Sequence, residues 1–273
     1  MALKTRGNRK NRSQDLHMRR CTVFVISFIS AIATGTAAAD ATAFVNVNVL
    51  PMSAERVLAQ QTVIVRDGTI RTIGDVDVIP VPEDARVVDG TDRFLIPGLA
   101  EMHAHVPPAG STELERDLAL YVANGVTTVR GMLGHASHLQ LREDLLEGRI
   151  TGPRLITSGP SLNGRSVSGA ADGARQVREQ HAAGYDFVKI HPGLDDEEFA
   201  AIARTANELG IPLAGHVPVS VGLGNALQAG MASIDHLDGY MAALMPPNYD
   251  ASGGYGGFFD VLLAGDVDMD RIA

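Results

Sequence analysis

Two histidines one residue apart, His103 and His105, close the apolar run "FLIPGLAEMHAHVP" at residues 94–107. The run is typical of a buried strand, in which residues two apart point to the same face. Two imidazoles on one face of a buried strand are unfavourable for packing, but imidazole is a good ligand for zinc and similar divalent metals. The pair therefore predicts a metal site at the end of this strand.

Further histidines follow later apolar runs, since His216 comes after "IPLAG" and His236 after "ASID". In a parallel barrel the carboxyl ends of the strands meet at one mouth, where catalytic groups gather. Taken singly, His216 and His236 would each more often be structural than ligating. Together with the first pair, they predict one metal centre built from three strand ends. We expect three other histidines to lie at the surface, on predicted loops or helices: His135, His138 and His181.

The run "GYDFVKIHPG" places Lys189 inside a buried strand, where an ammonium group is unfavourable. One interpretation is a lysine paired with a neighbouring carboxylate. The other is that burial favours the neutral amine, which can take up CO₂ as a carbamate that bridges two metal ions. Strand alternation returns His191 to the same side, as a candidate for substrate contact. We therefore predict Lys189 and His191 as catalytic residues.

From residue 94 onward, short apolar runs alternate with segments of helical spacing. The clearest helix is "DDEEFAAIARTANELG" at residues 195–210, which is acidic at its start and stopped by glycine. Such alternation predicts βαβ units and a parallel sheet. About six units favour a (β/α) barrel of the TIM type, which needs eight. We therefore expect an incomplete barrel over residues 94–273, and a sequence that is a fragment or a truncated product.

Residues 40–93 read instead as a small β-rich unit. Its runs "AFVNVNVLP", "QQTVIVRDG", "TIRTIGDVDVI" and "ARVVDG" are apolar or alternating, and each is bounded by Gly, Pro or Asp-Gly. Asp67 and Gly68 between two β-branched runs predict a tight hairpin.

Residues 1–39 have the order of a secretory signal peptide: a basic start, an apolar stretch and small residues at 37–39. The apolar stretch is shorter than the ~20 residues that span a bilayer. We therefore expect a periplasmic or secreted protein without stable membrane insertion.

Without residues 1–39, 16 basic and 31 acidic residues remain, and the net charge becomes −15. So acidic a chain would repel nucleic acid. Cys21, the single cysteine, leaves with the signal, so no disulfide is expected.

The motifs "DGTDRFLIPGLAEMHAHV", "ANGVTTVRG", "GYDFVKIH", "LAGHVP" and "SIDHLDGY" together resemble the metal-dependent amidohydrolase superfamily. Within it they resemble the imidazolonepropionase-like branch, which includes prolidases and Xaa-Arg dipeptidases. The resemblance covers residues 42 to roughly 245. It implies that His103 and His105 bind one metal ion and that His216 and His236 bind a second. It also implies that carbamylated Lys189 bridges the two ions. It also implies two zinc ions and a small β-sandwich before residue 94.

Three departures from the family pattern are visible. The strand-eight aspartate, a metal ligand and proton carrier in the family, has no counterpart before the sequence ends. Gly131 stands where the family often has an aspartate, and the loop "SGPSLNGRSVSG" lacks a histidine-containing turn. Gly131 and the loop without histidine make the substrate pocket differ from the family pattern. The missing aspartate makes the activity of this chain an open question.

The sequence therefore predicts a metal-dependent hydrolase that cleaves a carbon–nitrogen bond of an amide, dipeptide or lactam with a metal-bound hydroxide. The first alternative is a single-metal enzyme in which Lys189 remains an amine. The second is an inactive truncated relative that at most binds metal. A sugar- or peptide-binding module is disfavoured because aromatic residues make up only 5% of the chain. An open six-stranded sheet exposes a strand edge, so residues 40–273 alone should be insoluble or oligomeric.

Overall fold

The computed structural model describes residues 41–246 and 260–265, which divide into two compact units. Of the described residues, the first unit holds 41–49 and 57–95, and the second holds 50–56 and those from 96 onward. The predicted signal peptide lies outside the described residues. Within these ranges, no helix combines the length and the hydropathy that crossing a bilayer requires.

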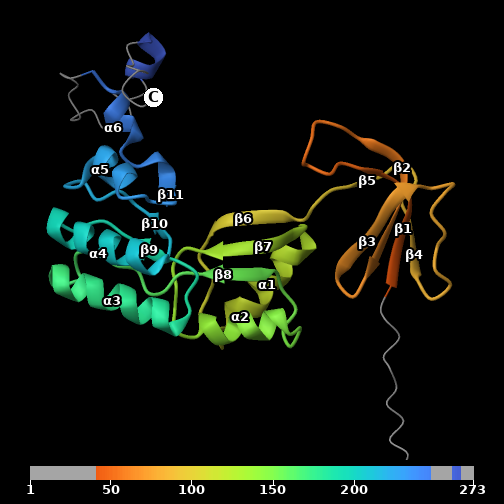
Figure 1. The fold of residues 1–273 in the computed structure, drawn as a ribbon, viewed down its shortest axis with the longest axis horizontal. Coiled ribbons are helices and arrows are strands. Elements are labelled where there is room, and N and C mark those ends of the chain that lie inside the picture. Colours follow the sequence, from red (N-terminus) through yellow and green to blue (C-terminus); the bar gives the residue numbers. More distant parts are fainter. Residues whose placement is uncertain (1–40, 247–259, 266–273) are drawn as a thin grey trace, which may run out of the picture. The chain divides into compact units, whose positions relative to one another are not determined.

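The first unit is a five-stranded sheet formed by the segments predicted as strands (Figure 1). Its strands are β1 (Ala41–Val49), β2 (Leu58–Arg66), β3 (Thr69–Asp75), β4 (Arg86–Asp89) and β5 (Phe94–Leu95). They are ordered β3-β2-β1-β4, and β5 also pairs with β1. Asp67 and Gly68 join β2 to β3 with positive φ at both residues, as a type I′ turn requires. The predicted hairpin is confirmed, while the sandwich stays a prediction.

The apolar run at residues 94–107 is divided between the two units, so the prediction of one buried strand is wrong. Phe94–Leu95 belong to the first unit, whereas Leu99–Ala104 form strand β6 of the second. Pro97 separates them, because it lacks the N–H that a continuous strand needs for its ladder. Strand β6 pairs only with β7 among the described strands, and the side chain of Met102 is half exposed at this edge.

Six parallel strands, each followed by a helical segment, make up the second unit, as the alternation predicts. The strands are β6, β7 (Val126–Gly131), β8 (Arg154–Thr157), β9 (Val188–Ile190), β10 (Leu213–Gly215) and β11 (Ser233–Ile234). The helices are α1 (Thr112–Ala123), α2 (His138–Leu146), α3 (Ala170–Ala183), α4 (Asp196–Leu209), α5 (Gly222–Gln228) and α6 (Tyr240–Leu244). Two three-stranded sheets, β6-β7-β8 and β9-β10-β11, are joined by isolated bridges from Ser158 to Phe187 and from Leu162 to Ile190.

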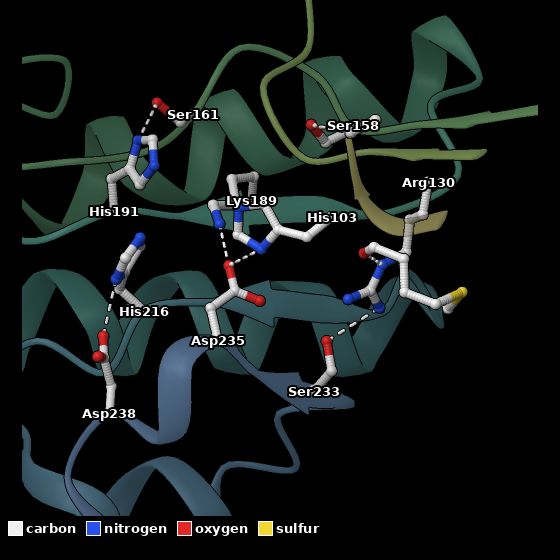
Figure 2. Close-up of polar contacts among 12 residues, drawn as sticks. His103, Arg130, Ser158, Ser161, Lys189, His191, His216, Ser233, Asp235 and Asp238 are labelled. Atoms are coloured by element: carbon white, nitrogen blue, oxygen red, sulfur yellow. Dashed lines mark hydrogen bonds and ion pairs between the residues drawn. The ribbon is translucent and has the colours of Figure 1, made fainter. Parts of the chain in front are cut away.

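This run of strands curves, but it does not close into a barrel within the described residues. Arg130 of β7 donates an Nη1 hydrogen bond to the Ser233 Oγ atom of β11 at 3.0 Å, although three strands lie between them (Figure 2). The curvature therefore brings early and late strands together across the interior. The number of strands agrees with the predicted incomplete barrel, and a full TIM barrel is not confirmed.

The core lies between the strands and the helices that cover them. One cluster packs β9 and β10 against α3, α4 and α5, and it includes the fully buried Val188, Ile190 and Ile202. A second packs β6, β7 and β8 against α1 and α2, around Leu118 and Val129. Because β9 and β10 are buried along their whole length, the close-packed core fixes the position of the residues at their carboxyl ends.

Helix α4, predicted from its periodicity, begins at a capping box. The Asp195 carboxylate accepts a hydrogen bond from the Glu198 N–H at 2.8 Å, and the Glu198 carboxylate accepts one from the Asp195 N–H at 3.0 Å. Asp195→Ala should lower the free energy of unfolding in urea by about 1 kcal/mol, because it leaves a helix N–H unpaired. Ser111→Ala is the control, because Ser111 is the N-cap residue of α1 and its side chain makes no cap hydrogen bond. This change should lower the free energy of unfolding by less than Asp195→Ala does. Equal losses in the two variants would contradict the prediction.

Candidate metal centre

The predicted ligands come from four parallel strands and lie at or just beyond their carboxyl ends. His103 lies in β6 and Lys189 in β9, while His105 follows β6 and His216 follows β10. His236 lies in the short 3-10 helix η1 (Asp235–Leu237) directly after β11. The structure therefore places all five side chains at the edge where active sites of (β/α) proteins form.

The histidine rings form a continuous series across this edge. Ring centroids are 5.4 Å apart for His103 and His105, and 4.8 Å apart for His103 and His236. They are 5.2 Å apart for His216 and His236, and 5.0 Å apart for His191 and His216. The structure thus brings the sequence-predicted histidines together, and their role as ligands stays a prediction.

Lys189 is completely buried, and its Nζ atom donates a hydrogen bond to Asp235 Oδ2 (Figure 2). This is the carboxylate-paired lysine that the sequence left open as one interpretation. The His103 Nδ1 atom lies 3.6 Å from the same oxygen. Asp235 is a site residue that sequence reasoning missed, although it directly precedes the predicted ligand His236. Its buried carboxylate links β6, β9 and the segment after β11.

The surroundings lower the pKa of two of these imidazoles and so favour their neutral form. Burial lowers the pKa of His103; the charge of Asp235 opposes this shift, and that of Lys189 adds to it. Burial also lowers the pKa of His191 to about 4, with Lys189 as the next largest cause. Neutral imidazole is the form that binds a metal ion. At neutral pH both rings therefore have the protonation state that metal or substrate binding requires.

Two unusual backbone conformations place His216 and His236. At Gly215, φ is +132° and an added Cβ would lie 2.2 Å from the Ile190 carbonyl oxygen, so only glycine lets β10 approach β9 here. His236 itself adopts a left-handed conformation with φ of 54°. This conformation is uncommon for a residue other than glycine, and such strain is concentrated at functional sites. Its occurrence at a predicted ligand supports a functional reading of the cluster.

Asp238 is a second carboxylate that sequence reasoning missed. Its Oδ2 atom lies 2.7 Å from His216 Nδ1 (Figure 2). A histidine whose Nδ1–H donates to a carboxylate presents the lone pair of Nε2, the usual arrangement in metal sites. The sequence "DHLD" could have pointed to Asp238, because Asp235 and Asp238 both stand within two residues of the predicted ligand His236.

Asp238→Ala should weaken zinc binding roughly 10- to 100-fold, since an outer carboxylate that orients a ligating histidine has this effect. Titration calorimetry of metal-free protein with Zn²⁺ measures the change. Glu208→Ala, which removes an exposed carboxylate of α4, is the matched control and should leave affinity unaltered. Equal affinities for the Asp238 variant and the unmodified protein would remove Asp238 from the site.

Four histidines outside the predicted ligand set were also assigned positions from the sequence. His191 lies at the site edge, with Nδ1 3.0 Å from Ser161 Oγ. Of the histidines expected at the surface, His135 and His181 are exposed, but His138 is fully buried, so that prediction is wrong. The His138 Nε2 atom lies 3.3 Å from the Pro107 carbonyl oxygen, because the start of α2 packs on the loop after β6. Local sequence does not contain that tertiary contact.

The donor atoms fit a divalent metal. His103, Asp235 and His236 each offer one ligand atom, and these three atoms lie within 4.8 Å of one another. Imidazole nitrogen and carboxylate oxygen are donors that zinc takes at about 2.0–2.2 Å. Asp235 is shared in this arrangement, because Lys189 bonds to the same carboxylate. The site could therefore hold a metal ion beside a buried lysine.

Solved structures share this fold. Bottromycin amidohydrolase is 26% identical, with a TM-score of 0.64, and the match covers 82% of this chain and 48% of that one. A Xaa-Pro dipeptidase with methionine bound in its active site is 19% identical, with a TM-score of 0.61 and coverages of 71% and 61%. A provisionally assigned prolidase from Bifidobacterium longum is 22% identical, with a TM-score of 0.63 and coverages of 72% and 54%. No protein-family model matches the sequence, and no curated protein matches it either.

These similarities show that the described chain has the fold of the amidohydrolases, as the sequence resemblance predicts. The chain spans between 48% and 61% of the length of these three structures. It therefore corresponds to part of each of them.

Proposed function

We propose that this chain carries the metal centre of an exported hydrolase that cleaves carbon–nitrogen bonds in amides or dipeptides. The adjacency of the His103, His105, His216 and His236 rings, beside the buried Lys189–Asp235 pair that His103 also approaches, carries the proposal. The shared fold of solved amidohydrolases and dipeptidases supports it. Export rests on the signal-like order of residues 1–39, and it makes small peptides in the periplasm or medium a suitable substrate class.

In the proposed centre, His103 and His105 would hold one divalent ion and His216 and His236 a second, with carbamylated Lys189 between them. When bound, the ions would activate a water molecule and polarise the substrate carbonyl. The complete burial of Lys189, the only lysine in residues 40–273, supports a role for its side chain in the centre. Zinc is the proposed metal, since histidine dominates the donor set.

The remaining side chains would orient the centre and the substrate. Asp238 fixes the ring of His216 through Nδ1 and leaves Nε2 free. Burial lowers the pKa of His103 and so favours its unprotonated imidazole. His191, whose Nδ1 atom is within hydrogen-bonding distance of Ser161 Oγ, would contact the substrate from the side of β9.

The ion pair between Lys189 and Asp235 favours a second candidate, a single-metal hydrolase in which Lys189 remains an amine. In it, Asp235 would join His103 and His236 as ligands. Lys189 is the only lysine in residues 40–273. Growth with ¹³C-bicarbonate would therefore give one carbamate carbon signal, from Lys189 alone, in the two-metal centre and none in the single-metal centre.

The activity itself is tested by assaying the purified protein against N-acyl amino acids and dipeptides before and after chelation. We expect hydrolysis that is lost when the metal is removed and recovered when Zn²⁺ is restored. Metal-loaded, folded protein that hydrolyses none of these substrates would overturn the proposal in favour of an inactive metal-binding relative.

A further inference from the structure

A cavity of about 670 Å³ opens beside His191 and His216. Its other lining residues belong to the loops after β8 and β9: Asn163, Gly164, Arg165, Pro192 and Gly193. The volume is in the range that small-molecule sites occupy. Because His216 is also a proposed metal ligand, the cavity lies where the non-reacting part of a bound substrate would extend.

Arg165 is the one permanently charged residue that lines this cavity, and no lining residue is acidic. Among the described residues, its guanidinium makes no ion pair or hydrogen bond; only its backbone N–H is bonded. Arg142 and Arg175, by contrast, are paired with carboxylates of Asp186 and Asp172. A guanidinium without a protein partner in a cavity without carboxylates can receive an anion.

The loop that carries Arg165 is fixed by its own hydrogen bonds. The Asn163 side-chain oxygen accepts from the backbone N–H of Arg165 at 2.9 Å and of Ser166 at 3.2 Å. Gly164 packs so closely on the loop after β9 that an added Cβ would lie 2.2 Å from the Gly193 carbonyl oxygen. The two loops therefore support each other and hold the backbone of Arg165 at the cavity, while its side chain is exposed to solvent.

We propose that Arg165 binds a carboxylate of the substrate, so that the substrates are dipeptides or N-acyl amino acids with a free α-carboxylate. This inference rests on the proposed function and names the substrate class of the same site. The planar guanidinium matches a carboxylate with two parallel hydrogen bonds. Neighbouring residues of a peptide are about 3.8 Å apart between Cα atoms. Arg165 and His216 line the same cavity, so one small substrate in it can contact both residues.

The first test compares an N-acetyl amino acid with its carboxamide, which has the same scissile bond without the charge. We expect kcat/KM to favour the acid roughly 10- to 100-fold, as a charge-assisted hydrogen-bonded pair would. Arg165→Met should bring this ratio close to one by raising KM for the acid, and Arg165→Lys should recover part of it. Arg178→Met, which removes an exposed arginine of α3 outside the cavity, should leave the ratio as it is.

The second test measures binding without turnover, by calorimetric titration of the full chain with an N-methylsulfonyl amino acid, its carboxamide and inorganic phosphate. We expect the acid to bind at least tenfold more tightly than the other two, and Arg165→Met but not Arg178→Met to remove the difference. Tighter binding of phosphate would overturn the carboxylate assignment.

The two tests separate the inference from the proposed function. Equal hydrolysis of acid and carboxamide by the unmodified protein would overturn the role of Arg165 and leave the hydrolase intact. Absence of any hydrolysis, with Arg165-dependent binding of the sulfonyl acid, would overturn the hydrolase and support the carboxylate site.

Discussion

In the metal-free protein, where Lys189 is an amine paired with Asp235, Lys189→Met is expected to lower the free energy of unfolding by about 3–5 kcal/mol, because it leaves a buried carboxylate without its partner. The Lys189 side chain is completely buried and that of Asp235 is 3% exposed, so water cannot replace the lost ammonium. Methionine keeps the length and apolar character of the lysine stem, so the loss reports the charge rather than a cavity. Urea unfolding, followed by circular dichroism, measures the effect.

The double variant Lys189→Met with Asp235→Asn is the control for this prediction. Removing both charges should recover much of the loss, since a buried pair replaced by neutral groups is often close to neutral in stability. A single Lys189→Met variant that loses less than about 1 kcal/mol would contradict the buried ion pair. Equal losses in the single and double variants would show that packing, not charge, determines the effect.

His103→Ala is expected to weaken zinc binding by more than about 100-fold, beyond the effect of losing an outer-shell partner. His103 contacts three other members of the cluster. Its ring is next to the rings of His105 and His236, and its Nδ1 atom faces Asp235. Competition with a chromophoric chelator measures the affinity, and hydrolysis should fall with it.

His135→Ala is the matched control, because His135 is an exposed histidine that lies outside this cluster. It should keep the affinity and the activity of the unmodified protein. If both histidine variants bound zinc as the unmodified protein does, the histidine cluster would not be the metal centre.

The sequence predicted the features that local patterns encode. Each of the six apolar runs from residue 94 onward contains a strand of the second unit, and α4 begins and ends next to Asp195 and Gly210. The gathering of the histidines was predictable for the same reason, because parallel strands place their carboxyl ends together. The hairpin at Asp67 and Gly68 followed from its turn chemistry alone.

The contacts that complete the site depend on tertiary structure and could not be predicted. Lys189 and Asp235 are 46 residues apart in sequence, and the sequence could offer a paired lysine only as one of two interpretations. The burial of His138 against the loop after β6 is equally non-local. The division of residues 94–107 between two units was missed because both halves are apolar, and only Pro97 marks the break.

The amount of zinc bound per folded chain shows whether the gathered histidines form a metal centre. The measurement is equilibrium dialysis of the chelator-stripped protein against Zn²⁺, followed by elemental analysis, for the unmodified protein and for the variant with His103 and His236 both replaced by alanine. We predict about two zinc ions per chain, or about one if Lys189 stays an amine, and almost none in the variant. If the folded, unmodified protein retained no zinc, or if the variant retained as much zinc as the unmodified protein, these histidines would not form the metal centre.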